Sequence, residues 1–257
     1  MSRIIAISTN KGGVLKTSIT TNLAGILSKD SKVLIIDSDN QGNASLSFGL
    51  QPDDFELSLY NVMVDGMNAK KAIVKAYENV DILPSNDDMS FLEFDILTNM
   101  HEYKKPFSLL KSKIKDIESD YDYILIDTPP NLGLTQGNVL SVSHEVLIPF
   151  QPESYSMRSL VKMLNAVKNF KEDHNPSMEV LGVVATLVDR RTVLHDEIVQ
   201  ECRKYCYEKG IKMFYAEIPK AIRYASSVAY EGLPATLTAK NNDLVKAYHD
   251  LKGEILQ

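Results

Sequence analysis

Residues 10–18, NKGGVLKTS, have the composition of a loop that binds phosphate. Gly12 and Gly13 allow the backbone to approach an anion and to adopt φ and ψ values that other residues avoid. If a helix begins after them, its free N–H groups point at the same anion. Lys16 can then reach the β- and γ-phosphates, and the Thr17 hydroxyl suits Mg²⁺, which prefers oxygen ligands. These residues predict a site for a nucleotide and magnesium.

The loop departs from the usual phosphate-loop pattern, G-x-x-x-x-G-K-[ST], at two positions. Asn10 stands in place of the first glycine, and Leu15 stands in place of the glycine before the lysine. Leucine keeps the backbone N–H that phosphate needs. If the site requires a positive φ, leucine costs on the order of 1 kcal/mol or more in strain. If φ is negative, only the space beside the phosphates matters, and the sequence leaves both possibilities open.

Three carboxylates follow apolar runs at positions where a nucleotide site needs them. Asp127 ends the run YILID, where an acidic residue beside a phosphate loop holds Mg²⁺. Asp37 and Asp39 lie two residues apart, so both point to one face if the strand geometry continues. One of them can orient the attacking water and the other the water shell of the metal. The alternatives are a helix cap or a turn at Asp127, an ordinary strand-to-loop turn at Asp37 and Asp39, and a glycine-rich turn before a helix at residues 10–18.

The elements that would position these residues alternate between apolar runs and helical patterns. Residues 17–28 and 154–171 have helical spacing. Near-continuous apolar strands joined by helices predict an α/β fold: a doubly wound, mostly parallel β-sheet flanked by helices on both faces. In such sheets, ligands bind at the carboxyl ends of the strands. Over residues 53–118 we expect helices that decorate one side of the sheet, with the exception of the strand at 80–85. We expect a single domain over 1–257. The predicted strands are 3–9, 32–39, 80–85, 122–130, 145–150, 181–188 and 213–219.

Composition excludes several classes of protein. The net charge of −6 gives no global basic field, so any contact with DNA needs a local basic patch. No stretch approaches the roughly 20 apolar residues of a membrane helix, and the N-terminus lacks the apolar length of a signal peptide, which predicts a cytoplasmic protein. Cys202 and Cys206 are the two cysteines, and with His195 alone nearby they are interpreted as helix-face thiols rather than metal ligands.

Four stretches resemble the ParA/MinD family of deviant Walker P-loop ATPases, and its ParA/Soj branch of DNA-partitioning ATPases in particular. KGGVLKTS is similar to the family's K-G-G-x-G-K-[ST]-[ST], and DSDNQGN to D-x-D-P-Q-x-N, with Asn40 where proline is common. LIPFQPESYSMRSL and EIPKAIRYASSVAYEGLPA resemble two further family segments, the first with Ser159 where glycine is common. The matches span nearly the whole chain in order.

The resemblance implies ATP or ADP and Mg²⁺ as cofactors. It implies that Lys11 is the signature lysine, which reaches the partner's phosphates in an ATP-dependent homodimer and acts like an arginine finger. It implies catalytic roles for Lys11, Lys16 and Asp39, with Asp39 activating water. The residues that it implies for nucleotide binding are Lys11, Gly12, Gly13, Val14, Leu15, Lys16, Thr17, Ser18 and, beside the adenine, Pro219. Thr17, Asp37 and Asp127 are implied for the metal, and Arg191, Lys220 and Arg223 are candidates for nonspecific DNA binding.

The same resemblance predicts a nucleoid-associated switch that segregates a plasmid, mobile element or chromosome and is reset by a centromere-binding, ParB-like adaptor. The loop begins about ten residues from Met1, so no N-terminal helix-turn-helix domain is expected. Residues 241–257 mix acids and bases, which disfavours a membrane-targeting helix. Two alternatives stay open: a nucleotide-dependent scaffold with weak or no catalysis, and a metabolic ATP-dependent ligase on the same fold.

Overall fold

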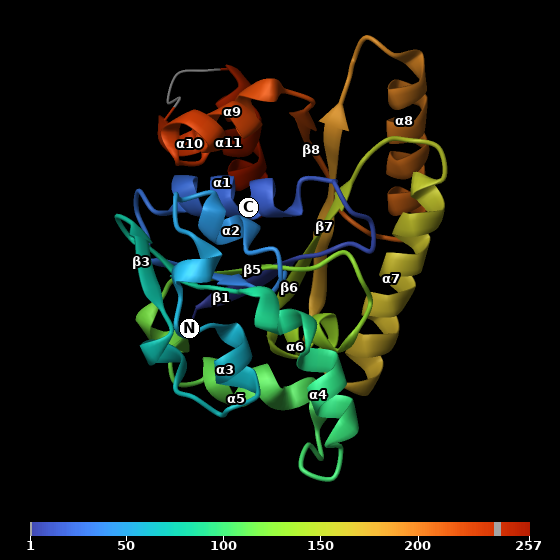
Figure 1. Cartoon of the computed structure of the whole chain (residues 1–257). Coiled ribbons are helices and arrows are strands. Elements are labelled where there is room, and N and C mark those ends of the chain that lie inside the picture. The colour runs from blue at the N-terminus through green and yellow to red at the C-terminus, as the bar shows by residue number, and fades with distance from the viewer. Residues whose placement is uncertain (1, 239–242) are drawn as a thin grey trace.

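A sheet runs through the middle of the protein, and helices cover both of its faces (Figure 1). The computed structural model describes residues 2–238 and 243–257, without the side chains of residues 222, 223, 225, 243 and 244. Its eight strands in this part of the chain are β1 (Arg3–Ile7), β2 (Val33–Asp37), β3 (Val74–Tyr77), β4 (Val80–Leu83), β5 (Tyr123–Asp127), β6 (Glu145–Phe150), β7 (Glu179–Val188) and β8 (Met213–Pro219).

The strand order is β3-β4-β2-β5-β1-β6-β7-β8, and every neighbouring pair is parallel except β3 with β4. This confirms the predicted fold class. The helices are α1 (Lys16–Leu27), α2 (Asn43–Leu46), α3 (Leu59–Met63), α4 (Leu92–Thr98), α5 (Leu109–Ile114), α6 (Leu134–Val142), α7 (Ser156–Asp173), α8 (Val193–Glu208), α9 (Ile222–Glu231), α10 (Ala235–Thr238) and α11 (Asp243–Ile255).

The two-residue period of β1 explains why both faces of the sheet are covered. Ile5 and Ile7 pack with α1 and α11, which lie above the sheet in Figure 1. Ile4 and Ala6 pack on the other side, with α3, α4, α5 and α6. Because each face of the strand is apolar, each must be buried, and each buried face requires a layer of helices.

Strand β3 is a correction to the expected helical decoration. It pairs antiparallel with β4 and forms one edge of the sheet. Its residues alternate between half-buried and exposed, because a single face of this edge strand packs on the core. Four residues of this kind, VKAY, lack the continuous apolar run by which the buried strands could be predicted.

At the opposite edge, the side chain of Glu254 covers part of β8. The pairing of β7 with β8 shifts register between Val183 and Ala185, so the ladder is irregular opposite residues 213–217. There the backbone N–H groups of Tyr215 and Ala216 both donate to the Glu254 carboxylate, at 2.9 and 2.7 Å. Glu254 lies on α11, so this helix is tied to the strand through backbone donors that the sheet leaves unpaired.

Cys202 and Cys206 are buried on α8 among apolar side chains. No group of three or more His, Cys, Asp or Glu side chains that could hold a metal ion occurs among the residues described. The helices in the same part of the chain include none with the length and apolar content to cross a membrane.

Candidate nucleotide site

The loop between β1 and α1 has two residues in the left-handed region of backbone space. Gly13 has φ of 72°, and Leu15 has φ of 66° and ψ of 26°. Leu15 is the N-cap of α1, so Lys16 is the first residue of the helix. The helix therefore begins at the lysine, and its free N–H groups face the loop. The open question about Leu15 is answered: φ is positive, and leucine is strained there.

The Leu15 side chain is partly buried and packs against the core cluster that contains Ile19 and Leu23. This packing offsets part of the strain of about 1–2 kcal/mol that a non-glycine residue carries in this region. The two contributions can be separated, because glycine removes both the strain and the packing, whereas alanine removes the packing alone.

We expect Leu15→Gly to be more stable than Leu15→Ala by about 1 kcal/mol. Elsewhere in a helix or strand, glycine is less stable than alanine by about 0.5–1 kcal/mol. Urea unfolding of the two variants measures the difference. An Ala variant as stable as the Gly variant, or more stable, would show that position 15 does not require a positive φ.

Lys16 is buried at the start of α1, and its Nζ donates to the backbone carbonyl of Lys11 at 3.3 Å. Burial lowers the pKa of Lys16, while the nearby carboxylates of Asp127 and Asp39 oppose that shift. An ammonium group removed from water and folded onto its own loop is positioned to exchange the carbonyl for a phosphate oxygen. Lys16 thus lies at the start of α1 with its ammonium on the loop, and its contact with phosphate stays a prediction.

Asp127 joins the loop to the end of β5. Its Oδ2 accepts a hydrogen bond of 2.6 Å from the Thr17 hydroxyl, and its Oδ1 lies 3.5 Å from Thr20 Oγ1. The carboxylate is fully buried, and burial raises its pKa to about 7. Asp37 pairs with Asp127 across the β2–β5 ladder and is also fully buried. The pKa of Asp37 is raised as well, by burial first and then by Asp127.

Two buried carboxylates on adjacent strands, with a threonine hydroxyl between one of them and the loop, form an oxygen donor set that fits Mg²⁺. Their raised pKa values have the same first cause, because burial disfavours the charged form of both carboxyl groups. Thr17, Asp127 and Asp37 therefore fit the metal role that the resemblance implies, and that role stays a prediction.

The raised pKa values predict how stability depends on pH in the absence of nucleotide and magnesium. The folded protein holds these protons more tightly than the unfolded chain, whose Asp pKa is about 3.9. The stabilisation is complete below that value and is lost as the pH rises through about 7. We expect Tm to fall between pH 5 and pH 8, and to fall less in Asp127→Asn, which retains an acceptor for Thr17.

Thermal melts across this pH range provide the measurement, with a shift of roughly 2–4 °C for each kcal/mol lost. Asp54→Asn is the matched control, since Asp54 is exposed. Equal slopes for Asp127→Asn and the unmodified protein would contradict the prediction.

Asp37 and Asp39 do not share a strand face. Strand β2 ends at Asp37, whose carboxylate accepts backbone N–H groups from Asp39 at 3.2 Å and Ala44 at 3.0 Å. Asp39 lies in the turn beyond, where its Oδ1 accepts from the Gln41 N–H. The expected strand geometry is wrong here, because the chain turns back so that Asp37 can bind the loop. Asp37 anchors the segment that carries Asp39.

Lys11 makes an ion pair that the sequence did not predict. Its Nζ lies 2.7 Å from Glu153 Oε2 and 3.5 Å from Ser156 Oγ, at the start of α7. Tyr155, the N-cap of α7, is exposed and has a φ of 68°. A tyrosine in the left-handed region is strained, and such strain concentrates at functional sites. Glu153 lies in LIPFQPESYSMRSL, a stretch that resembles the family, but the resemblance implied no role for this residue.

Pro219 lies at the carboxyl end of β8, on the rim of a hollow of about 360 Å³. The residues around it are Val188, Asp189, Arg190, Arg191, Glu217 and Lys220. Arg191 is exposed and pairs with Asp189 at 2.6 Å, and Arg190 pairs with Glu217 at 2.9 Å. The structure thus brings Pro219, Arg191 and Lys220 together. Arg223 is in α9, and its side chain lies outside the described residues.

The remaining loop residues differ in what they can offer to phosphate. Val14 is buried, so it presents its backbone. The Ser18 hydroxyl is 2.9 Å from the Tyr248 hydroxyl of α11, so Ser18 would offer its backbone N–H to a ligand. A Cβ added to Gly13 would have no other atom within 4 Å, so space does not require glycine there. The positive φ of Gly13 does.

Sheet order, loop and carboxylates together define a P-loop nucleotide-binding protein with a deviant Walker A motif. The family model described as AAA domain matches residues 2–180. The "ParA family protein" of Mycoplasma pneumoniae is 32% identical over 267 residues, which cover 98% of this chain and 97% of the relative. The chain belongs to the ParA/MinD family of P-loop ATPases.

Two solved structures are similar over most of their length. A putative plasmid partition protein from Borrelia burgdorferi, bound to AMPPNP, has a TM-score of 0.81 at 25% identity, covering 100% of this chain and 99% of that one. Cobyrinic acid a,c-diamide synthase from Mycobacterium smegmatis, with a bound ATP analog and magnesium, has a TM-score of 0.82 at 26% identity, with coverage of 96% and 91%.

Proposed function

We propose that this protein is an ATP-dependent DNA-partitioning ATPase for a plasmid, mobile element or chromosome. The observation that carries the proposal is the Thr17–Asp127 bond of 2.6 Å, because it fixes the phosphate loop to the end of β5 with Lys16 beside it. Membership of the ParA family and the similarity to a plasmid partition protein support the cellular role.

In this proposal, the loop N–H groups and Lys16 bind the phosphates of ATP. Thr17, Asp127 and Asp37 hold Mg²⁺, which when bound neutralises charge on the phosphates. Asp39 orients the attacking water, and the bonds from Asp37 to the Asp39 and Ala44 N–H groups keep this segment in place. Pro219 lies beside the base. Hydrolysis to ADP and phosphate is slow until a partner stimulates it.

In the same proposal, Lys11 acts across a homodimer. Before the dimer forms, Lys11 is paired with Glu153 of its own chain. An exposed ion pair contributes about 0–1 kcal/mol, so releasing Lys11 from Glu153 costs little. The lysine is then free to place its charge at the phosphates of the partner, where charge develops in the transition state. ATP shifts the protein to the dimer because it binds that state more tightly.

The dimer binds DNA without sequence preference, through Arg191, Lys220 and Arg223. Both Arg191 and Lys220 are exposed at the carboxyl end of the sheet. Phosphate neutralisation by such residues is independent of sequence and sensitive to salt. In this proposal the protein acts in the cytoplasm on the nucleoid, and a ParB-like adaptor is the stimulating partner.

We expect Arg191→Ala and Lys220→Ala each to weaken ATP-dependent DNA binding at every duplex sequence, and to reduce the salt slope by about 1. Retention of an arbitrary duplex at several salt concentrations measures both effects. Lys75→Ala is the matched control, because Lys75 is a paired surface cation on β3, at the far edge of the sheet. Unchanged retention in both variants would remove these residues from the DNA surface.

One experiment separates the proposal from its two rivals. Phosphate release from Mg·ATP is measured with and without DNA, against Lys16→Ala as background. Turnover above background together with ATP-dependent DNA binding supports the partition ATPase. A scaffold predicts DNA binding without turnover. The similarity to a diamide synthase is the reason to test for a ligase. A ligase predicts turnover that depends on a small carboxylate substrate, and no ATP-dependent DNA binding.

A further inference from the structure

An exposed apolar surface lies on α4 and the residues that flank it, away from the phosphate loop. Four large apolar side chains are more than half exposed there: Phe91 (58%), Phe94 (67%), Leu97 (54%) and Met100 (51%). On the opposite side of the helix, Leu92 and Ile96 are fully buried in the core and fix α4 to the protein. Folding therefore does not need the outer four, and their clustering within ten residues marks an interaction surface.

This surface continues toward a groove between α6 and α7. The Glu93 carboxylate lies 3.1 Å from the position that a Cβ on Gly133 would occupy, so this side of α4 faces the start of α6. Leu97 follows Glu93 by four residues and lies on the same side. Gly133 and the exposed Leu132 are also part of the groove lining.

The groove has a volume of about 230 Å³, and aromatic side chains are part of its lining. Phe107 and Phe170 pack edge to face with ring centroids 5.8 Å apart, and His174 lies against both. An apolar helix face with an adjoining aromatic groove suits an amphipathic helix, which presents anchors at i, i+3, i+4 and i+7.

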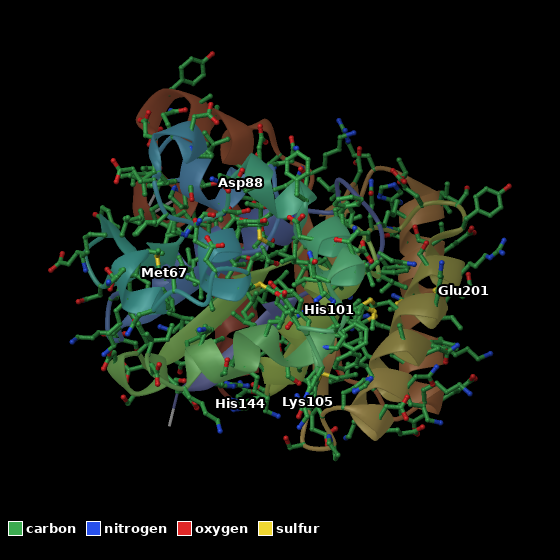
Figure 2. The ribbon with its side chains drawn as sticks, turned by 60° about the horizontal axis from the view of Figure 1, so that its bottom comes forward. Met67, Asp88, His101, Lys105, His144 and Glu201 are labelled. Carbon is green, nitrogen blue, oxygen red and sulfur yellow. The ribbon has the colours of Figure 1, made fainter. Side chains whose placement is uncertain are left out.

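Charge around the surface selects the kind of helix. Residues 86–103 contain five carboxylates and no lysine or arginine, and because only Lys104 and Lys105 follow, residues 86–105 still carry a net charge of −3 with His neutral (five acids against two lysines). Asp88 and His101, labelled in Figure 2, lie near the two ends of this segment. None of the five carboxylates pairs with lysine or arginine in the part of the chain that the structure describes. The carboxylates are Asp87, Asp88, Glu93, Asp95 and Glu102.

A second copy of this chain does not suit the surface. A twofold contact would place the same patch on itself and bring its acidic side chains, such as Glu93, near those of the other copy. Like charges in such a contact cost several kcal/mol. An anionic lipid surface is disfavoured for the same reason. A basic partner gains from both the apolar side chains and the surrounding carboxylates.

We propose that the α4 surface, formed by Phe91, Phe94, Leu97, Met100 and Leu132, binds a basic amphipathic helix of a partner protein. The occupant lies along α4 with its apolar side toward Phe94 and Leu97, and with lysine or arginine toward Glu93 and the other carboxylates. It also touches the loop after Asp127 through Leu132. The binding itself requires neither nucleotide nor DNA, so the inference does not depend on the proposed function.

The test uses two fluorescent peptides of about 18 residues, with leucines at helical spacing and either lysines or glutamates at the polar positions. Anisotropy with the full chain, without nucleotide, measures Kd. We expect the lysine peptide to bind at least about tenfold more tightly than the glutamate peptide, and Phe94→Ser/Leu97→Ser to lose about tenfold or more. Leu194→Ser is the matched control, because Leu194 on α8 is 52% exposed and Leu97 is 54% exposed.

Equal binding of the two peptides, or lysine-peptide binding that the double substitution does not change, would overturn the proposal. Two further readouts identify another occupant. Sedimentation would show a nucleotide-free dimer that the double substitution dissociates if a second copy covered the surface. Binding to phosphatidylglycerol vesicles that the same substitution abolishes would assign the surface to lipid. Either result would also overturn the proposal.

Discussion

Lys16→Ala is expected to abolish useful ATP binding. The Lys16 ammonium is buried at the start of α1 beside Asp127, with a carbonyl of its own loop as its partner. Removing one side of a buried, hydrogen-bonded charge pair costs about 2–5 kcal/mol. In Kd this is roughly a 30-fold to several-thousand-fold loss. Titration with a fluorescent ATP analog and Mg²⁺ measures it.

The control is Lys29→Ala, because Lys29 is exposed just beyond the far end of α1. The apo protein should fold as well without the Lys16 ammonium, since burial disfavours that charge. A Lys16→Ala protein that folds and binds ATP as the unmodified protein does would show that residues 10–18 are not a phosphate loop.

Lys11→Ala is expected to leave nucleotide binding intact and to stop hydrolysis. The loop N–H groups and Lys16 remain, so the Kd for ATP should change by less than about threefold. A positive charge supplied to phosphates by a partner accelerates hydrolysis by about 10³-fold or more, so turnover should fall to background. The lost pair with Glu153 is exposed and contributes little to stability.

Mixing two inactive variants tests whether Lys11 acts across a dimer. In a mixed dimer of Lys11→Ala and Asp39→Ala, one of the two sites has its own Asp39 and a lysine from the other protomer. Random association makes about half of the dimers mixed, each with one working site, so activity should return to about a quarter of the unmodified level. No recovery, although the mixed dimers form, would place Lys11 in its own site.

The sequence predicted the parallel core of the fold well, because each central strand is a continuous apolar run. It missed β3, whose four residues alternate between half-buried and exposed on an edge. An edge strand needs one apolar face, and in so short a segment that pattern does not differ from a helix or a loop.

Within the site, the residue types were predictable and the backbone path was not. Thr17 and Asp127, 110 residues apart, meet at 2.6 Å because parallel strands end at one edge of the sheet. The φ of Leu15 and the turn that separates Asp39 from Asp37 depend on contacts with distant segments. Glu153 was missed for the same reason, since its pairing with Lys11 joins loops that follow different strands.

The position of Glu254 has a consequence for the behaviour of the protein at high concentration. Open strand edges are templates on which identical chains add to one another, and unpaired backbone N–H groups are their points of attachment. At β8, the carboxylate fills two such points and brings a negative charge to the edge. In the proposed role, many copies gather on one nucleoid, and there one side chain of α11 would limit edge-to-edge aggregation.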